Sequence, residues 1–182
     1  MTLYDKVTAA VTSLATSSPR RASRARSLAL APQCAWLADV LQHHIAIEQA
    51  FAGVRAAPDA EQRRAAQRWL ALLLTGHSMA EEAVLYPAMA LADQKLHSTS
   101  AYAEQGGAKV GMATLETLDP MSQDYLDALE HVRDAVARHV HEEEDNWYPV
   151  LARQGGAAEM ARLSRRYQEE FRRYMGSDSD LS

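Results

Sequence analysis

Apolar residues recur at helical spacing along most of the chain. Between Pro32 and Ala56 they stand mostly three or four positions apart, at Leu37, Val40, Leu41, Ile45, Ile47 and Phe51. Such spacing gathers them on one face of an amphipathic helix. A shorter run of the same period predicts an N-terminal helix over residues 3–16, with apolar positions at Leu3, Tyr4, Val7, Val11 and Leu14.

The same period predicts four more helices, over residues 58–91, 94–117, 122–153 and 157–175. Pro58 suits the first turn of a helix, and Ser122 suits a helix cap. Pro87 and Pro149 fall inside predicted helices. Because proline removes a backbone donor and crowds the preceding turn, we expect a local disturbance of the helix at each of them.

No segment has the alternating pattern of a strand, and the predicted helices are joined by short connections. These features predict an all-α fold with antiparallel neighbours, an up-down four-helix bundle over residues 33–154. An N-terminal helix and a basic linker precede it over residues 1–32, and a C-terminal helix and a tail follow over residues 155–182.

Composition narrows the class of protein. The net formal charge of −5 argues against a nucleic-acid-binding surface. The longest apolar stretch, Trp69–Leu74, is far too short to cross a bilayer, and residues 1–16 do not resemble a signal peptide. With Cys34 as the only cysteine, no intramolecular disulfide can form, so we expect a cytoplasmic protein. Pro19–Arg26 is rich in arginine; a solvated linker is the favoured interpretation, and an anion-binding segment is the alternative.

Two segments 62 residues apart repeat one another and carry the candidate chemistry. Each contains the pattern His-x-x-x-Glu-Glu-x-x-x-Tyr-Pro, over residues 77–87 and 139–149. The first long helix has a shorter version, His44 and Glu48. Residues four apart on a helix lie about 40° apart around its axis and roughly 6 Å apart along it, so an imidazole and a carboxylate can converge on one ion or bridge two.

A single pair of this kind usually means a surface ion pair. Two copies with matching Tyr-Pro tails, beside a third pair, favour a metal site over a metal-free bundle. Three helices would supply three histidines and three glutamates, at His44, Glu48, His77, Glu81, His139 and Glu143. Imidazole suits several transition metals and carboxylate shifts the preference towards iron or manganese, although zinc stays possible.

At these residues the chain resembles the hemerythrin family in its broad form, the HHE cation-binding domains. The resemblance covers about residues 33–154 and rests on Leu41–Glu48 and on the two repeated segments. It implies an antiparallel four-helix bundle that holds two non-haem irons. The ligands implied by this resemblance are His44, His77, Glu81, His139 and Glu143.

The third helix departs from the family pattern. Counting back from the Leu118-Asp119-Pro120 turn, Gln105 stands where the family often has a histidine. A neutral amide is a weaker ligand than imidazole, which argues against the histidine-rich site of an oxygen carrier. Glu48 offers a replacement carboxylate, which would bring the site closer to those of carboxylate-rich di-iron oxidases; His97 and His131 are less favoured alternatives.

For several neighbouring residues, a structural role is favoured over a direct role in metal binding. We expect His43 at the surface or next to the metal ligands, His141 at the surface, and Tyr86 and Tyr148 packed with their hydroxyls hydrogen-bonded. Glu82 and Glu144 could orient ligands or face solvent.

These observations predict a bundle that binds two iron ions and that binds or acts on O2, peroxide or NO. Oxidoreductase activity of a peroxidase-like, catalase-like or NO-related kind is one hypothesis. Non-enzymatic binding, storage or sensing of oxygen or iron is the other. No nucleic-acid or membrane partner is predicted, and the sequence identifies neither an organic substrate nor a protein partner.

Overall fold

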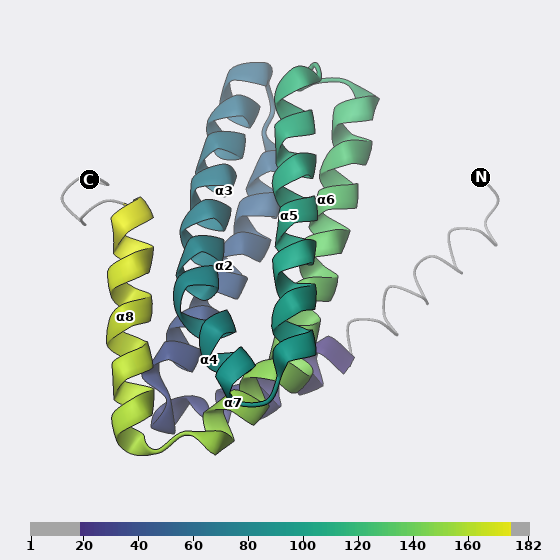
Figure 1. The fold of residues 1–182 in the computed structure, drawn as a ribbon. Coiled ribbons are helices and arrows are strands. Elements are labelled where there is room, and N and C mark those ends of the chain that lie inside the picture. Colours follow the sequence, from purple (N-terminus) through teal and green to yellow (C-terminus); the bar gives the residue numbers. More distant parts are fainter. Residues whose placement is uncertain (1–18, 176–182) are drawn as a thin grey trace.

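The computed structural model describes residues 19–175, which are helical almost throughout and contain no strand (Figure 1). Residues 19–28 form a helix, and Ala31–Gln33 form a 3-10 turn, η1. The elements that follow are α2 (Ala35–Ala56), α3 (Ala60–Ala80), α4 (Tyr86–Leu91), α5 (Lys95–Thr117), α6 (Gln123–Glu142), α7 (Tyr148–Gln154) and α8 (Ala157–Met175). The helix predicted over residues 3–16 lies outside the described range.

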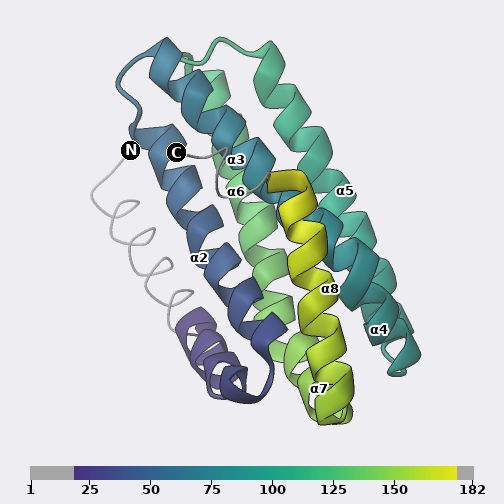
Figure 2. The ribbon, with the colours of Figure 1, turned by 90° about the vertical axis from the view of Figure 1, so that its left-hand side faces the viewer.

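Four long helical segments lie side by side and confirm the predicted all-α bundle (Figures 1 and 2). They are α2, α3 with its continuation α4, α5, and α6 with its continuation α7. Side chains fix where two of them begin: Asp59 accepts a hydrogen bond from the backbone N–H of Gln62, and Ser122 from that of Tyr125. Ser122 therefore caps α6 as predicted, whereas Pro58 lies just before the cap of α3.

The predicted disturbances at Pro87 and Pro149 take the form of π turns. The wide turn η2 (Glu81–Leu85) joins α3 to α4, and η3 (Glu143–Trp147) joins α6 to α7. In a regular helix, a proline ring clashes with the carbonyl four residues earlier. The wider turn just before each proline accommodates this conflict and lets the helix continue.

The apolar core consists of two clusters along the bundle. One contains Trp36, Leu41, Ala80 and Trp147, and the other contains Ile47, Leu73 and Val136. On α2, α3 and α6, the sequence between the two clusters carries polar side chains that are buried. The interior therefore has a polar layer across the middle of the bundle, with apolar packing on either side of it.

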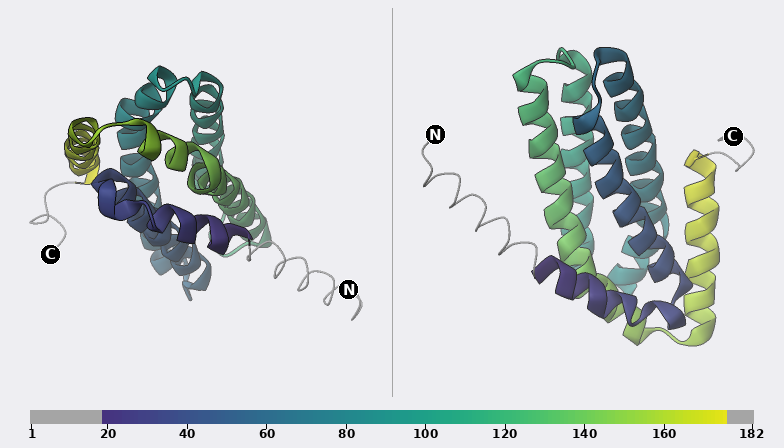
Figure 3. Two further views of the ribbon diagram at one scale, coloured as in Figure 1. Left: turned by 90° about the horizontal axis from the view of Figure 1, so that it is seen from below. Right: turned by 180° about the vertical axis from the view of Figure 1, so that it is seen from behind.

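Elements outside the four segments pack against them. The helix over residues 19–28 crosses the bundle near η3, where Ser27 Oγ donates to the backbone carbonyl of Glu144 at 2.6 Å (Figure 3). The interpretation of Pro19–Arg26 as a linker is therefore wrong, because this segment is helical and packs through the buried Ser23, whereas most of its other residues are exposed as expected. The final helix α8 packs along α2 and α3, close enough for Met175 Sδ to lie 3.0 Å from the position of a Cβ on Gly76 (Figure 2).

Within the described residues, no helix has both the length and the apolar character that a bilayer crossing requires.

Candidate metal centre

Four side chains from three of the long segments converge in the polar layer. They are His44 on α2, His77 on α3, Glu81 at the start of η2 and Glu143 at the start of η3. One ligand atom from each lies within 4.8 Å of the others, and all four residues are buried. Both glutamates begin a π turn, so the turns that accommodate the prolines also set the direction of the two carboxylates.

The chemistry of these atoms fits a cation. His44 Nε2 lies 3.3 Å from Glu143 Oε2, and His77 Nε2 lies 3.3 Å from Glu81 Oε2. Even so, His44 Nε2, His77 Nε2 and Glu143 Oε2 are buried without a hydrogen-bond partner. Leaving buried polar atoms unpaired typically costs about 1–3 kcal/mol each. A metal ion held between the imidazoles and carboxylates would satisfy all three atoms.

His139 lies beside this group. Its Nε2 is 3.1 Å from Glu143 Oε1 and 3.1 Å from the hydroxyl of Tyr86. The structure thus brings together five of the six predicted ligands, His44, His77, Glu81, His139 and Glu143.

The sixth predicted ligand, Glu48, lies elsewhere, which corrects the sequence-based expectation. Its side chain is 57% exposed and pairs with Arg24, with 2.7 Å between Glu48 Oε1 and Arg24 Nη2. Although Glu48 follows His44 by one turn, the His44 side chain is directed inward while Glu48 lies at the surface of α2. Helical spacing places His44 and Glu48 on nearly the same face of α2, but it does not show which of the two side chains points into the bundle.

Each histidine has its second ring nitrogen engaged. His44 Nδ1 donates to Glu144 Oε1 at 2.9 Å, and His139 Nδ1 donates to Glu104 Oε2 at 2.7 Å. His77 Nδ1 lies 3.1 Å from the hydroxyl of Tyr167 on α8. Partners of this kind hold metal-binding imidazoles in one orientation and one tautomer, which here leaves all three Nε2 atoms for a metal.

The hydroxyl of Tyr167 is within hydrogen-bonding distance of two histidines. If His77 Nδ1 donates to the tyrosine oxygen, the tyrosine proton is free to be donated to His43 Nδ1, 2.9 Å away. His43 also stacks on Phe171, with ring centroids 3.7 Å apart. Burial and the charge of His44 lower the pKa of His43 to about 4, so it is a neutral acceptor. It lies beneath α8 with its ring centroid 5.9 Å from that of His77, so of its two expected positions it takes the one next to the metal ligands.

The two repeated tyrosines have their hydroxyls inside the centre. Tyr148 lies 2.5 Å from Glu81 Oε1 and 2.8 Å from Glu143 Oε1, while Tyr86 lies 3.1 Å from Glu143 Oε1. Each tyrosine therefore reaches the glutamate of the other repeat. Burial and the adjacent carboxylates raise the pKa of both phenols, so both keep their protons.

Gln105 occupies the third-helix position in the centre. Its Nε2 donates to Glu81 Oε2 at 2.7 Å and to the Tyr86 hydroxyl at 2.6 Å. The amide therefore holds a carboxylate and a phenol in place.

The remaining candidates lie outside the donor group. His97 stacks on Trp147, with ring centroids 5.8 Å apart, and His131 is exposed. Glu82 pairs with Lys109 at the surface. His141 is partly buried, which differs from the expected exposure.

Burial and pairing shift the ionisation of the metal-free centre. Burial lowers the pKa of His44, but pairing with the carboxylates of Glu143 and Glu144 outweighs it and raises the pKa to about 9. Burial and the charge of Glu143 raise the pKa of Glu81 to about 8. The Glu143 carboxyl is buried too, but His139 and His44 hold its pKa well below the usual range. Protons thus occupy some of the sites that a metal would take.

The sequence analysis did not identify three residues that fix the ligands in place, either directly or through Glu144. Arg24 donates from Nε to both carboxylate oxygens of Glu144, at 3.0 and 3.1 Å. Glu104 and Tyr167 come from α5 and α8. The one signal in the sequence is the glutamate doublet, which leaves Glu144 either orienting a ligand or facing solvent; its hydrogen bond with His44 Nδ1 supports the first of these.

Comparison with known protein families agrees with the helical fold. The sequence model of the Hemerythrin family, described as the hemerythrin HHE cation-binding domain, matches residues 36–151. No curated protein and no solved structure gives a significant match. Arg24 and Tyr167 lie outside the matched residues.

Proposed function

Because the chain belongs to the hemerythrin HHE cation-binding family, we propose that its buried centre binds two metal ions, iron foremost, and that it binds or acts on O2, peroxide or NO. The observation that carries the proposal is the set of three buried donor atoms without partners, on His44, His77 and Glu143. Manganese and zinc remain alternatives, because they accept the same ligands.

Five residues would hold the metals, namely His44, His77, Glu81, His139 and Glu143. Each carboxylate has two oxygens, so Glu81 and Glu143 can each reach two ions. The set has fewer imidazoles and relatively more carboxylate than the family's oxygen carriers, because Gln105 replaces a histidine. Harder, anionic donors favour ferric over ferrous iron, which supports redox chemistry over reversible oxygen binding.

Iron bound here would supply electrons and an open position for a small oxidant. The chain's own groups position the carboxylates and hold protons close to them. The hydroxyls of Tyr86 and Tyr148 are the proton-bearing groups in contact with Glu81 and Glu143. Apolar packing on both sides of the centre along the bundle shields it from bulk water in those two directions.

A sensing or storage role is the second candidate, favoured by one specific observation. His44 is held through Glu144 by the helix over residues 19–28, and His77 is held by α8. Binding or loss of a metal could therefore be transmitted to elements on the outside of the bundle.

Elemental analysis of protein purified without added metal tests the proposal. We expect about two metal ions per chain, mainly iron, as in other carboxylate-bridged bundles. A folded, cooperative protein with almost no metal, even after anaerobic addition of ferrous iron, would contradict it. With the iron-loaded protein, peroxide turnover would favour the enzyme over the sensor.

A further inference from the structure

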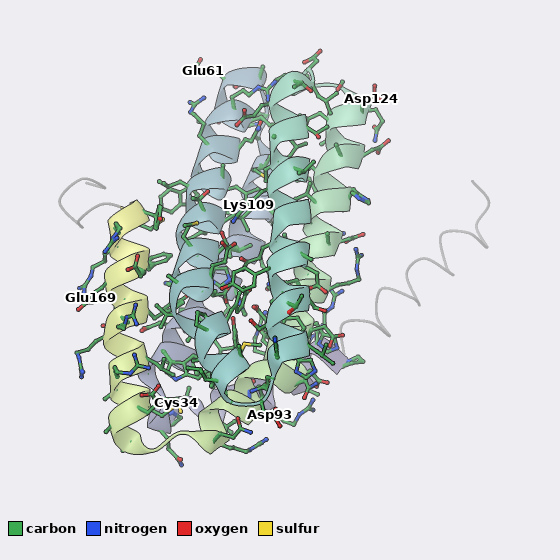
Figure 4. The ribbon with its side chains drawn as sticks, viewed as in Figure 1. Cys34, Glu61, Asp93, Lys109, Asp124 and Glu169 are labelled. Carbon is green, nitrogen blue, oxygen red and sulfur yellow. The ribbon has the colours of Figure 1, made fainter. Side chains whose placement is uncertain are left out.

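A cavity of about 230 Å³ lies between α3, α5 and α6, beside the candidate metal centre. Its lining includes the exposed residues Thr75, Lys109 and Glu116, so it reaches the surface between α3 and α5. Lys109 is labelled in Figure 4. The other end of the cavity is lined by buried polar side chains of the centre, His77, Gln105 and His139.

The walls are apolar and many of their side chains are small. They include Ala71, Leu74, Ala108, Met112, Ala135 and Val136. An apolar cavity of about 150 Å³ is already large enough to bind benzene. The space here is therefore far larger than a diatomic molecule needs and is sufficient for a single aromatic ring.

One buried polar atom of a lining residue has no hydrogen-bond partner. Gln105 is only 6% exposed, and its Nε2 is used by Glu81 and Tyr86. Its Oε1 is buried and has no partner. A ligand hydroxyl donating to this oxygen would remove the cost of leaving it unpaired.

We propose that this cavity binds a small aromatic molecule carrying one hydroxyl group, of the size of phenol. Its ring packs against the alanine and valine walls, and its hydroxyl donates to Gln105 Oε1. The site places an organic ligand directly beside the metal centre. Binding does not require the metal, so metal content measured on the same samples tests the metal proposal separately.

Calorimetric titration with phenol tests the site. We expect saturable 1:1 binding with a Kd at or below about 1 mM. Ala108→Phe should fill part of the cavity and weaken binding at least about tenfold. Ala103→Phe is the matched control, because Ala103 is exposed on the same helix and does not line the cavity; it should bind phenol like the wild type.

Two further measurements need no substitution, so they stay informative if Ala108→Phe does not fold. Toluene has the same number of heavy atoms as phenol but no donor, so toluene should bind no more tightly than phenol if Gln105 accepts the hydroxyl. Nuclear Overhauser contacts should connect the phenol ring with the Met112 methyl group. The proposal is overturned by an absence of saturable binding, by binding without these contacts, by equal affinity in Ala108→Phe, or by a clear preference for toluene.

Discussion

The three histidines of the centre share one arrangement but have different partners. In each, Nε2 is directed towards the carboxylates and Nδ1 is held by an outer group, at Glu144, Tyr167 or Glu104. A carboxylate partner makes an imidazole a stronger donor than a phenol partner does. His44 and His139 should therefore bind metal more strongly than His77.

Removing a metal-binding imidazole should remove metal. We expect His77→Ala and His139→Ala each to lose most of the bound iron and to melt at a lower temperature, because metal bound only by the folded state stabilises it. Metal analysis and thermal melts measure both effects. His131→Ala, at an exposed position on α6, should leave both unchanged; unaltered metal content in the first two variants would refute the assignment.

The two glutamates near His44 should behave differently. Glu144→Gln weakens the partner of His44 Nδ1, so we expect about tenfold lower metal affinity. Glu48→Gln changes an exposed carboxylate paired with Arg24, so its metal affinity should stay within about twofold of the wild type. Competition with a coloured chelator measures both values. A larger loss in Glu48→Gln would restore Glu48 as a ligand.

Among the elements, the flanking helices do more than cover the bundle. The helix over residues 19–28 reaches His44 through Arg24 and Glu144, and α8 reaches His77 through Tyr167. The two π turns place Glu81 and Glu143 at equivalent points of the repeated segments. The centre thus depends on elements beyond the matched 36–151 segment.

Loss of one hydroxyl on α8 tests this dependence. Tyr167→Phe keeps the ring packing but removes the partner of His77 Nδ1 and of His43. We expect roughly tenfold weaker metal binding with little change in helix content by circular dichroism. Tyr174→Phe on the same helix serves as the control. Equal metal affinity in both variants would mean that α8 only covers the bundle.

At the scale of the whole molecule, the metal-free interior concentrates charge and protons. The pKa of His44 is about 9, and that of His139 is about 10 because its pairing with Glu143 and Glu104 outweighs burial. Glu81 keeps its proton up to about pH 8. Metal binding must displace such protons, so it should strengthen as the pH rises.

The metal-free protein should lose stability between about pH 6.5 and pH 10. The raised pKa values of His44 and His139 mean that the stability they contribute is complete below the unfolded value near 6.5. That contribution is lost as the pH rises through the folded values of about 9 and 10. The raised pKa of Glu81 acts in the same direction, because its contribution is complete below the unfolded value near 4.5 and is lost as the pH rises through the folded value of about 8. The combined effect is on the order of a few kcal/mol.

Thermal melts of chelator-treated protein at pH 6.5 and pH 9 measure this loss. The iron-loaded protein is the control, and it should show a smaller change because its ligands are already deprotonated. A metal-free protein that is more stable at pH 9 than at pH 6.5 would contradict the assigned pairing.

The sequence by itself predicted the helices of the described residues, the bundle and most of the side chains that meet in the buried centre. Helical periodicity is local, and the repeated His-x-x-x-Glu-Glu-x-x-x-Tyr-Pro segments mark equivalent positions on two helices whatever the packing. The resemblance to HHE domains, carried by those residues, is confirmed by the match over residues 36–151. Prolines likewise indicated where the helices would be disturbed, because their effect is on the adjacent backbone.

Tertiary structure alone decided which groups surround those donors. Glu48 and Glu144 are both within reach of the centre by sequence pattern, but only the rotation of each helix about its axis puts Glu144 inside and Glu48 outside. Tyr167 reaches His77 from 90 positions away, and Arg24 reaches Glu144 from 120 positions away. Such contacts depend on how separate helices pack, and that packing arises from long-range burial of side chains that no local spacing encodes.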